Sequence, residues 1–75
     1  MPAFDISLNS ITDVKNFVNI VNKYSCDIEL KSGKYIVDAK SIMGILSLDL
    51  SKPIKIEFNC DNSEQINEDL KPYIV

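Results

Sequence analysis

The chain has no histidine and no tryptophan, and only two cysteines and two glycines among its 75 residues. Without histidine, general acid–base catalysis near neutral pH loses its usual side chain. Two cysteines alone cannot form a structural zinc site, which takes four nitrogen or sulfur ligands. We therefore expect neither a metal nor a cofactor. We interpret Cys26 and Cys60 as two small core residues.

Basic charge is also scarce. Eight Lys and Arg residues stand against eleven Asp and Glu residues, giving a formal net charge of −3. A nucleic-acid-binding surface needs positive charge to neutralise phosphates, so this composition argues against general nucleic-acid binding. No apolar run approaches the roughly 20 residues that span a bilayer, and Met1–Asp5 lacks the pattern of a signal peptide. We expect a cytoplasmic protein that binds neither nucleic acid nor membrane.

The length of the chain limits what it can contain. Seventy-five residues predict one domain spanning 1–75. A chain this short buries only roughly 60% of the surface that it exposes when unfolded, so most of its apolar residues are needed for the core. Little remains to build an enclosed catalytic cavity, and we expect a protein that is not an enzyme.

Hydrophobic periodicity predicts the order of the elements. Alternation with a period of two predicts strands over residues 4–8, 26–31, 35–37 and 54–60. Helical spacing predicts helices over residues 11–21, 41–48 and 64–71. The order β-α-β-β-α-β-α, with a hairpin turn at Ser32-Gly33, predicts an α+β fold. We expect an open-faced β-sandwich with a four-stranded, mainly antiparallel sheet and helices on one face.

The helix ends carry capping signals. Ser10 precedes the first helix and Asp13 follows three residues later, which is typical of a capping box. Ser41 is placed to cap the second helix, and Asp61-Asn62-Ser63 offers cap residues for the last. The predicted core stripe of the first helix consists of Ile11, Val14, Phe17, Val18 and Val21.

The segment before the last strand is the most specific part of the sequence. It reads Lys40-Ser41-Ile42-Met43-Gly44-Ile45-Leu46-Ser47-Leu48. With Lys23-Tyr24 closing the first helix and Gly33-Lys34 in the hairpin, it resembles the HPr family. These proteins are the phosphocarriers of the bacterial phosphoenolpyruvate–sugar phosphotransferase system. The resemblance covers nearly the whole chain and implies the same open-faced sandwich.

The resemblance ends at the family's phosphocarrier motif, His-x-Arg-Pro, which opens the first helix and whose imidazole relays phosphate. Aligned on Ser41, the chain has Ser10 in place of the histidine, Thr12 in place of the arginine and Asp13 in place of the proline. A serine phosphate ester is too stable for such a relay, and Asp13 would repel phosphate. We interpret these three residues as a helix cap and not as a catalytic site.

The family's second functional position is retained. In Gram-positive relatives, HPr kinase/phosphorylase phosphorylates the serine of this motif, and the modified protein binds a transcriptional regulator of catabolite genes. The resemblance makes Ser41 the matching residue. Its alternative role is that of a helix cap alone, worth about 1 kcal/mol. One branch of the family keeps this serine, lacks the histidine and acts only in regulation.

The second helix is apolar on more than one side. Its apolar residues are Ile42, Met43, Ile45 and Leu46. Some of them must join the core, but a two-turn helix cannot bury every side, so others should remain exposed. In the HPr family this helix forms the apolar centre of the docking face. Apolar residues surrounded by polar ones suit a protein interface, so we expect these four residues to bind partners.

Together these features predict an HPr-like protein that has lost phosphotransfer and retains protein binding, in the regulation of carbon metabolism. HPr kinase/phosphorylase and a transcriptional regulator are the expected partners. Two alternatives stay open: an accessory structural domain outside the phosphotransferase system, and a weak phosphocarrier that uses another residue. The sequence does not indicate the oligomeric state.

Overall fold

The computed structural model of the protein describes residues 3–61 and 63–75. Its strands are β1 (Ala3–Ile6), β2 (Asp27–Ser32), β3 (Tyr35–Asp38) and β4 (Ile54–Asn59). Its helices are α1 (Ile11–Val21), α2 (Ile42–Leu46) and α3 (Ser63–Asp69), and a 3-10 turn, η1 (Lys71–Tyr73), follows α3. The predicted order of elements is confirmed. Asn62, in the middle of the expected third cap, lies outside the described residues.

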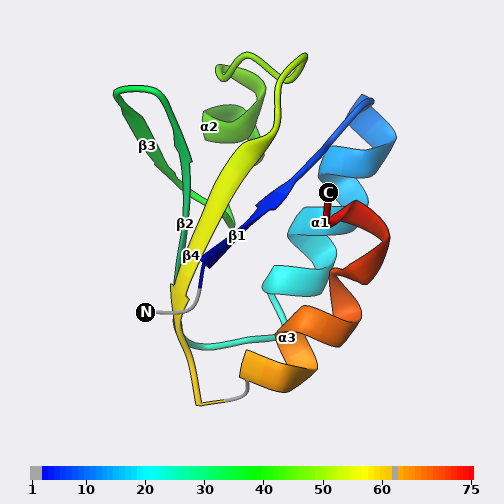
Figure 1. Ribbon diagram of the computed structural model, residues 1–75, viewed down its shortest axis with the longest axis vertical. Coiled ribbons are helices and arrows are strands. Elements are labelled where there is room, and N and C mark those ends of the chain that lie inside the picture. Colours follow the sequence, from blue (N-terminus) through cyan, green and yellow to red (C-terminus); the bar gives the residue numbers. More distant parts are fainter. Residues whose placement is uncertain (1–2, 62) are drawn as a thin grey trace.

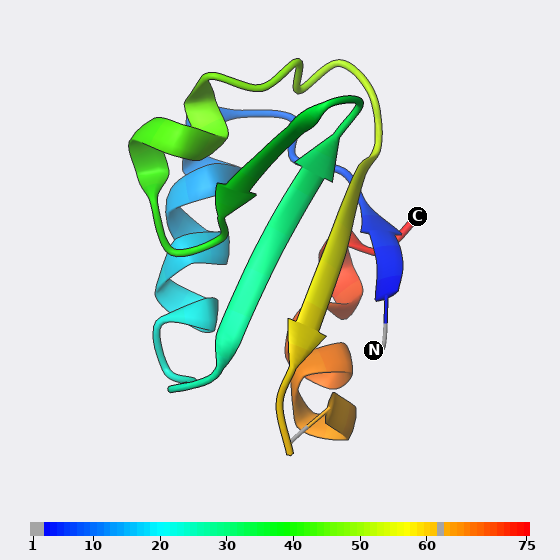
Figure 2. The same ribbon diagram turned by 90° about the vertical axis from the view of Figure 1, so that its left-hand side faces the viewer.

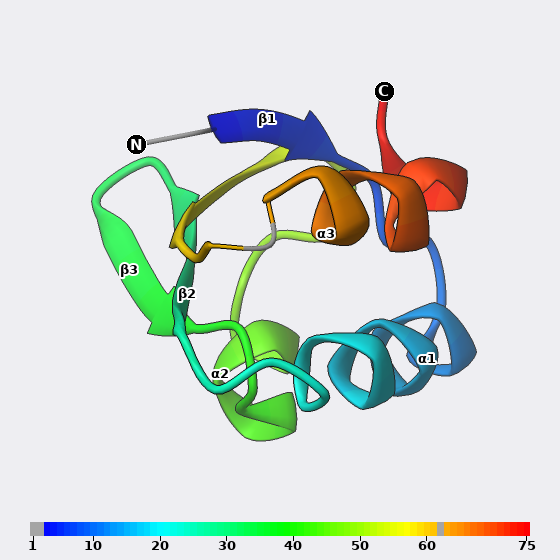
Figure 3. The same ribbon diagram turned by 90° about the horizontal axis from the view of Figure 1, so that it is seen from below.

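The four strands form one sheet in the order β1-β4-β2-β3 (Figure 2). All three neighbouring pairs are antiparallel. The helices lie together on one side of this sheet and leave its other face open (Figures 1 and 3). The predicted α+β open-faced sandwich is therefore confirmed, and α2 sits at the end of the helical layer beside β3.

The core lies between the sheet and the helices, because alternate side chains of each strand point toward the helical layer. In the central pair, Leu30 of β2 stands opposite Ile56 of β4, and both are fully buried. The other side chains with no exposed surface are Ile6, Leu8, Val14, Phe17, Val21, Ala39, Ile45, Ile54, Ile66 and Leu70. This core holds α1, α2 and α3 against the same face of the sheet.

α1 contributes most of the helical side of the core. Its buried residues are Val14, Phe17, Val18 and Val21. Ile11, which we predicted to belong to the same stripe, is 60% exposed. It is the first residue of the helix, and a rotation of roughly 100° per residue places it at the margin of the stripe. That one prediction was wrong, while the rest of the stripe is confirmed.

Phe17→Ala tests the packing of α1. Phe17 is fully buried, and its ring forms a T-shaped pair with that of Tyr73, with 6.4 Å between ring centroids. Removing the ring should lower the free energy of unfolding by about 3–5 kcal/mol, measured by urea denaturation. The matched control, Ile11→Ala, should change it by less than about 0.5 kcal/mol because Ile11 is exposed. Equal losses in the two variants would contradict this assignment of the core.

The two cysteines form a disulfide, so our prediction of two separate core residues was wrong. Asp27 pairs with Asn59 at the end of the β2–β4 ladder, and one further step places Cys26 opposite Cys60. Their Cα atoms are 5.3 Å apart, within the usual range for a disulfide. Both residues are half-buried at the end of the sheet. The prediction failed because the register of strands distant in sequence brings the cysteines together.

A side-chain hydrogen bond joins the end of α1 to α3. The Tyr24 hydroxyl donates to Asp69 Oδ2 at 2.5 Å, and Gln65 Nε2 donates to Asp69 Oδ1 at 3.0 Å. Burial, followed by the hydrogen bond and the negative charge of Asp69, raises the pKa of Tyr24 to about 12. The bond from Tyr24 holds the pKa of Asp69 below its ordinary value.

The raised pKa of Tyr24 predicts a loss of stability at alkaline pH. The pKa of Tyr24 is raised in the folded protein, so its contribution is fully present below about pH 10, the pKa of an unfolded tyrosine. The contribution is lost as the pH rises toward about 12. Thermal melts at successive pH values should therefore show a smaller drop over this interval for Tyr24→Phe than for the wild type.

Tyr35→Phe is the matched control, because Tyr35 is 71% exposed. Its melting temperature should fall between pH 10 and pH 12 as much as that of the wild type. If Tyr24→Phe follows the same course as both, the ionisation of Tyr24 does not couple folding to pH.

Candidate functional site

Ser41 begins α2 and caps it. Its backbone is extended, with φ −101° and ψ 107°, and its Oγ accepts the Gly44 N–H at 3.1 Å. The Ser41 carbonyl accepts the Ile45 N–H at 3.0 Å. The predicted capping role is therefore confirmed. The residue is half-buried, with its hydroxyl directed along the first turn of the helix.

Gly44 makes room for the Ser41 hydroxyl. A Cβ atom at this position would lie 3.2 Å from Ser41 Oγ and 3.3 Å from the Cβ of Val37 on β3. These distances are tighter than about nine in ten real contacts of a Cβ atom. At the other end of the helix, Ser47 Oγ donates to the Gly44 carbonyl at 2.6 Å. The glycine thus lets α2 approach β3 closely while the cap forms.

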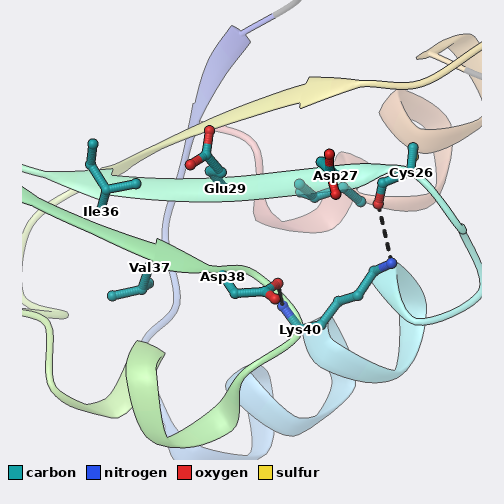
Figure 4. A pocket seen from close by; sticks show the side chains of 8 residues that line it. Cys26, Asp27, Glu29, Ile36, Val37, Asp38 and Lys40 are labelled. Atoms are coloured by element: carbon teal, nitrogen blue, oxygen red, sulfur yellow. Dashed lines mark hydrogen bonds between the residues drawn. The ribbon is translucent and has the colours of Figure 1, made fainter.

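Lys40 anchors the residue before Ser41. Its Nζ donates to the carbonyls of Tyr24, at 2.6 Å, and Cys26, at 3.1 Å. Figure 4 shows the side chain extended to Cys26. The Lys40 N–H donates to Asp38 Oδ1 at 2.9 Å. We missed this role in the sequence, because the acceptors are backbone carbonyls 16 and 14 residues away and no residue type marks them.

The predicted partner-binding residues of α2 divide into two sets. Ile42, Met43 and Leu46 are exposed by 38%, 79% and 39%, and we refer to them as the α2 surface. Ile45 is fully buried, so its predicted contact with a partner was wrong. At roughly 100° per residue, Ile42, Met43 and Leu46 fall within one arc of about 100°, and Ile45 lies outside that arc, on the side that packs on the core.

Ser10, Thr12 and Asp13 form the start of α1. The Asp13 N–H donates to Ser10 Oγ at 3.1 Å, which confirms the predicted cap. Asp13 Oδ2 accepts the Asn9 N–H at 3.0 Å, one residue earlier than a strict capping box requires. Thr12 is exposed. The Ser10 hydroxyl is used as a cap acceptor, with the Asp13 side chain directed back toward the preceding loop.

Within residues 3–61 and 63–75, no three Asp, Glu or Cys side chains come together as a ligand set for a metal ion. Over the same ranges, every helix is too short or too polar to cross a bilayer. The candidate site consists of the capping serine, Ser41, the lysine anchor beside it and the α2 surface.

Comparison with known proteins shows the family to which the chain belongs. Residues 13–73 match the family described as the PTS HPr component phosphorylation site. The chain belongs to the HPr family. The matched residues include Ser41 and all of α2, whereas Ser10 and Thr12 precede them. HPr-family proteins are phosphocarriers rather than enzymes, and they interact with other proteins of the phosphotransferase system.

Solved HPr structures share the fold along most of their length. HPr-C-His from Thermoanaerobacter tengcongensis is 28% identical, with a TM-score of 0.81, and the alignment covers 96% of this chain and 89% of that one. HPr from Bacillus anthracis is also 28% identical, with a TM-score of 0.74 and coverage of 99% and 94%. No curated protein sequence matches the chain.

A third structure shares the fold alone. It is Crh, the catabolite repression containing protein of Bacillus subtilis, at 24% identity and a TM-score of 0.70. The alignment covers 91% of this chain and 80% of Crh, which is described as a swapped dimer.

The cap at α1 yields a simple mutational test. Ser10→Ala removes the acceptor of the Asp13 N–H and should lower the free energy of unfolding by about 1 kcal/mol. Thr12→Ala is the control, since Thr12 is exposed and alanine suits a helix, so the loss there should be near zero. Urea denaturation measures both. A Ser10→Ala variant as stable as the wild type would rule out an energetic role for the cap.

Proposed function

We propose that this chain is a regulatory, cytoplasmic member of the HPr family that lacks the phosphohistidine relay and acts by binding other proteins in carbon metabolism. The observation that carries the proposal is the arrangement on α2, where the capping hydroxyl of Ser41 adjoins the exposed α2 surface. The chain contains no histidine, so the residue that carries phosphate in the family has no counterpart here.

The start of α1 supports the loss of the relay. In our alignment Ser10 takes the place of the histidine, and its Oγ already accepts the Asp13 N–H. The Asp13 carboxylate sits in the same turn and accepts the Asn9 N–H. An incoming phosphate would meet this negative charge, where the family's arginine supplies a positive one. This turn is therefore suited to capping a helix and unsuited to receiving a phosphoryl group.

The start of α2 suits a modified serine. Phosphorylation adds about 1.5–2 negative charges at pH 7 and three strong acceptor oxygens. The Oγ of Ser41 is already directed at the Gly44 N–H, so phosphate oxygens attached to it would lie near N–H donors of the first turn. The residues on either side of Ser41, Lys40 and Ile42, carry no negative charge, and the nearby Asp38 carboxylate accepts the Lys40 N–H.

The α2 surface suits a partner that binds apolar side chains and a phosphate group at the same time. Met43 is the most exposed of its side chains, at 79%, and a flexible thioether adapts to differently shaped pockets. Ile42 and Leu46 flank it on the same side of the helix. A complementary partner presents an apolar pocket bordered by arginine, which binds phosphate through paired hydrogen bonds. HPr kinase/phosphorylase and a transcriptional regulator are the proposed partners.

Incubation with HPr kinase/phosphorylase and ATP, followed by mass spectrometry, tests the modification. We expect one phosphate, located on Ser41. Ser41→Ala should abolish it, and the matched variant Ser47→Ala should retain it, because Ser47 lies at the opposite end of α2. The proposal fails if the wild type remains unmodified, or if the phosphate is carried by another residue.

A further inference from the structure

The disulfide lies where two backbone segments meet at one end of the sheet. Cys26 immediately precedes β2 and Cys60 immediately follows β4. The carbonyl of Cys26 also holds the ammonium group of Lys40, the residue before Ser41 (Figure 4). We propose that the Cys26–Cys60 disulfide is a thiol–disulfide exchange site, through which a dithiol reductant changes how firmly Ser41 is held.

The disulfide borders a cavity at the end of the sheet. A cavity of about 250 Å³ lies between segments 23–26 and 59–61, and both cysteines line it. Each cysteine is half-buried, so part of its surface is open to solvent. A structural disulfide sealed in a core would lack this access, and exchange requires an attacking thiolate to reach a sulfur atom.

In a reducing compartment such as the cytoplasm, the Cys26–Cys60 disulfide can be cleaved and formed again. Glutathione and thioredoxin keep cytoplasmic thiols reduced, and disulfides that do form there are usually transient or redox-sensing. This step rests on the cytoplasmic location given under the proposed function. In such a compartment the protein would pass between a disulfide form and a dithiol form as the reducing power of the cell changes.

The thiol–disulfide exchange with a dithiol reductant conserves atoms and electrons. A thiolate of the reductant attacks one sulfur of the disulfide, forms a mixed disulfide and releases the other cysteine as a thiolate. The second thiol of the reductant then displaces the remaining cysteine. Cys26 and Cys60 together gain two electrons and two protons and become thiols, and the reductant leaves as its own disulfide.

A chain of contacts connects this bond to Ser41. The disulfide ties Cys26 to the end of β4, one step beyond the last backbone pair, Asp27 with Asn59. Segment 24–26 is thereby held on two sides, and its carbonyls are positioned to accept the two hydrogen bonds of Lys40 Nζ. Cleavage of the disulfide releases Cys26 from the end of β4, so the accepting carbonyls of Tyr24 and Cys26 become more mobile. Water then competes for the Lys40 ammonium, and the backbone leading into Ser41 loses its anchor.

Hydrogen exchange measures the coupling directly. The Gly44 N–H donates to Ser41 Oγ and the Ile45 N–H donates to the Ser41 carbonyl, so their exchange rates report how firmly the cap is held. We expect both amides to exchange about tenfold faster after reduction with dithiothreitol, the effect of losing one hydrogen bond to a charged group. NMR at 25 °C on the full chain gives the rates, and alkylation with a mass shift verifies the free thiols.

Two variants separate the disulfide from the lysine anchor. Lys40→Met keeps most of the apolar stem and removes the ammonium, so exchange at Gly44 and Ile45 should be fast in both redox states. The double variant Cys26→Ser with Cys60→Ser should resemble the reduced wild type whether or not dithiothreitol is present. Both results are required if the effect passes from the disulfide through Lys40.

Equal exchange at Gly44 and Ile45 in the disulfide and dithiol forms would overturn the proposal. A reduced protein that is unfolded at 25 °C would overturn it as well, because a switch needs two folded states. The exchange measurement uses no kinase. A failure to phosphorylate Ser41 would therefore count against the proposed function, and equal exchange rates would count against the redox coupling alone.

Discussion

The antiparallel register between β2 and β4 is the constraint on which the rest of this structure depends. It sets Leu30 against Ile56 on the core face, and the helices pack over that pair. On the open face, Lys31 of β2 forms an ion pair with Glu57 of β4. A shift of one residue would exchange the two faces, exposing the apolar side chains and burying the charges. The same register also brings the two cysteines together.

The short helix α2 has two sides with different roles. Ile45 is fully buried on the inner side, and Gly44 allows the close approach to Val37 on β3. The outer side carries the α2 surface. Ser41, which is half-buried, caps the start of the helix. A helix of five residues has little stability of its own, because helix formation needs a costly first turn. Its cap, its buried side and the Lys40 anchor therefore hold in place the features that we propose partners recognise.

Much of the fold could be predicted because its signals are local. The stripe of α1 follows from helical spacing, and Ser10 and Ser41 each cap a helix by accepting an N–H three residues ahead. The segment 40–48 placed the chain in its family. These features involve residues close in sequence, so their pattern is visible without knowing how the elements pack.

Apart from Ile11, whose place at the margin of the α1 stripe follows from helical spacing, the missed features are set by packing between distant segments. The disulfide depends on the register of β2 and β4, and the Lys40 anchor depends on where segment 24–26 runs. The difference between Ile45, which is buried, and Ile42, which is exposed, depends on which side of α2 faces the core. Each needs a tertiary relationship that periodicity and capping rules do not contain.

NMR mapping of the partner interface tests the central claim most directly. The ¹⁵N-labelled chain, with and without phosphate on Ser41, is titrated with the transcriptional regulator of catabolite genes. The account predicts shifts centred on Ser41, Ile42, Met43 and Leu46, with tighter binding of the phosphorylated form. Shifts centred on the open face of the sheet, or binding that ignores the phosphate, would contradict it.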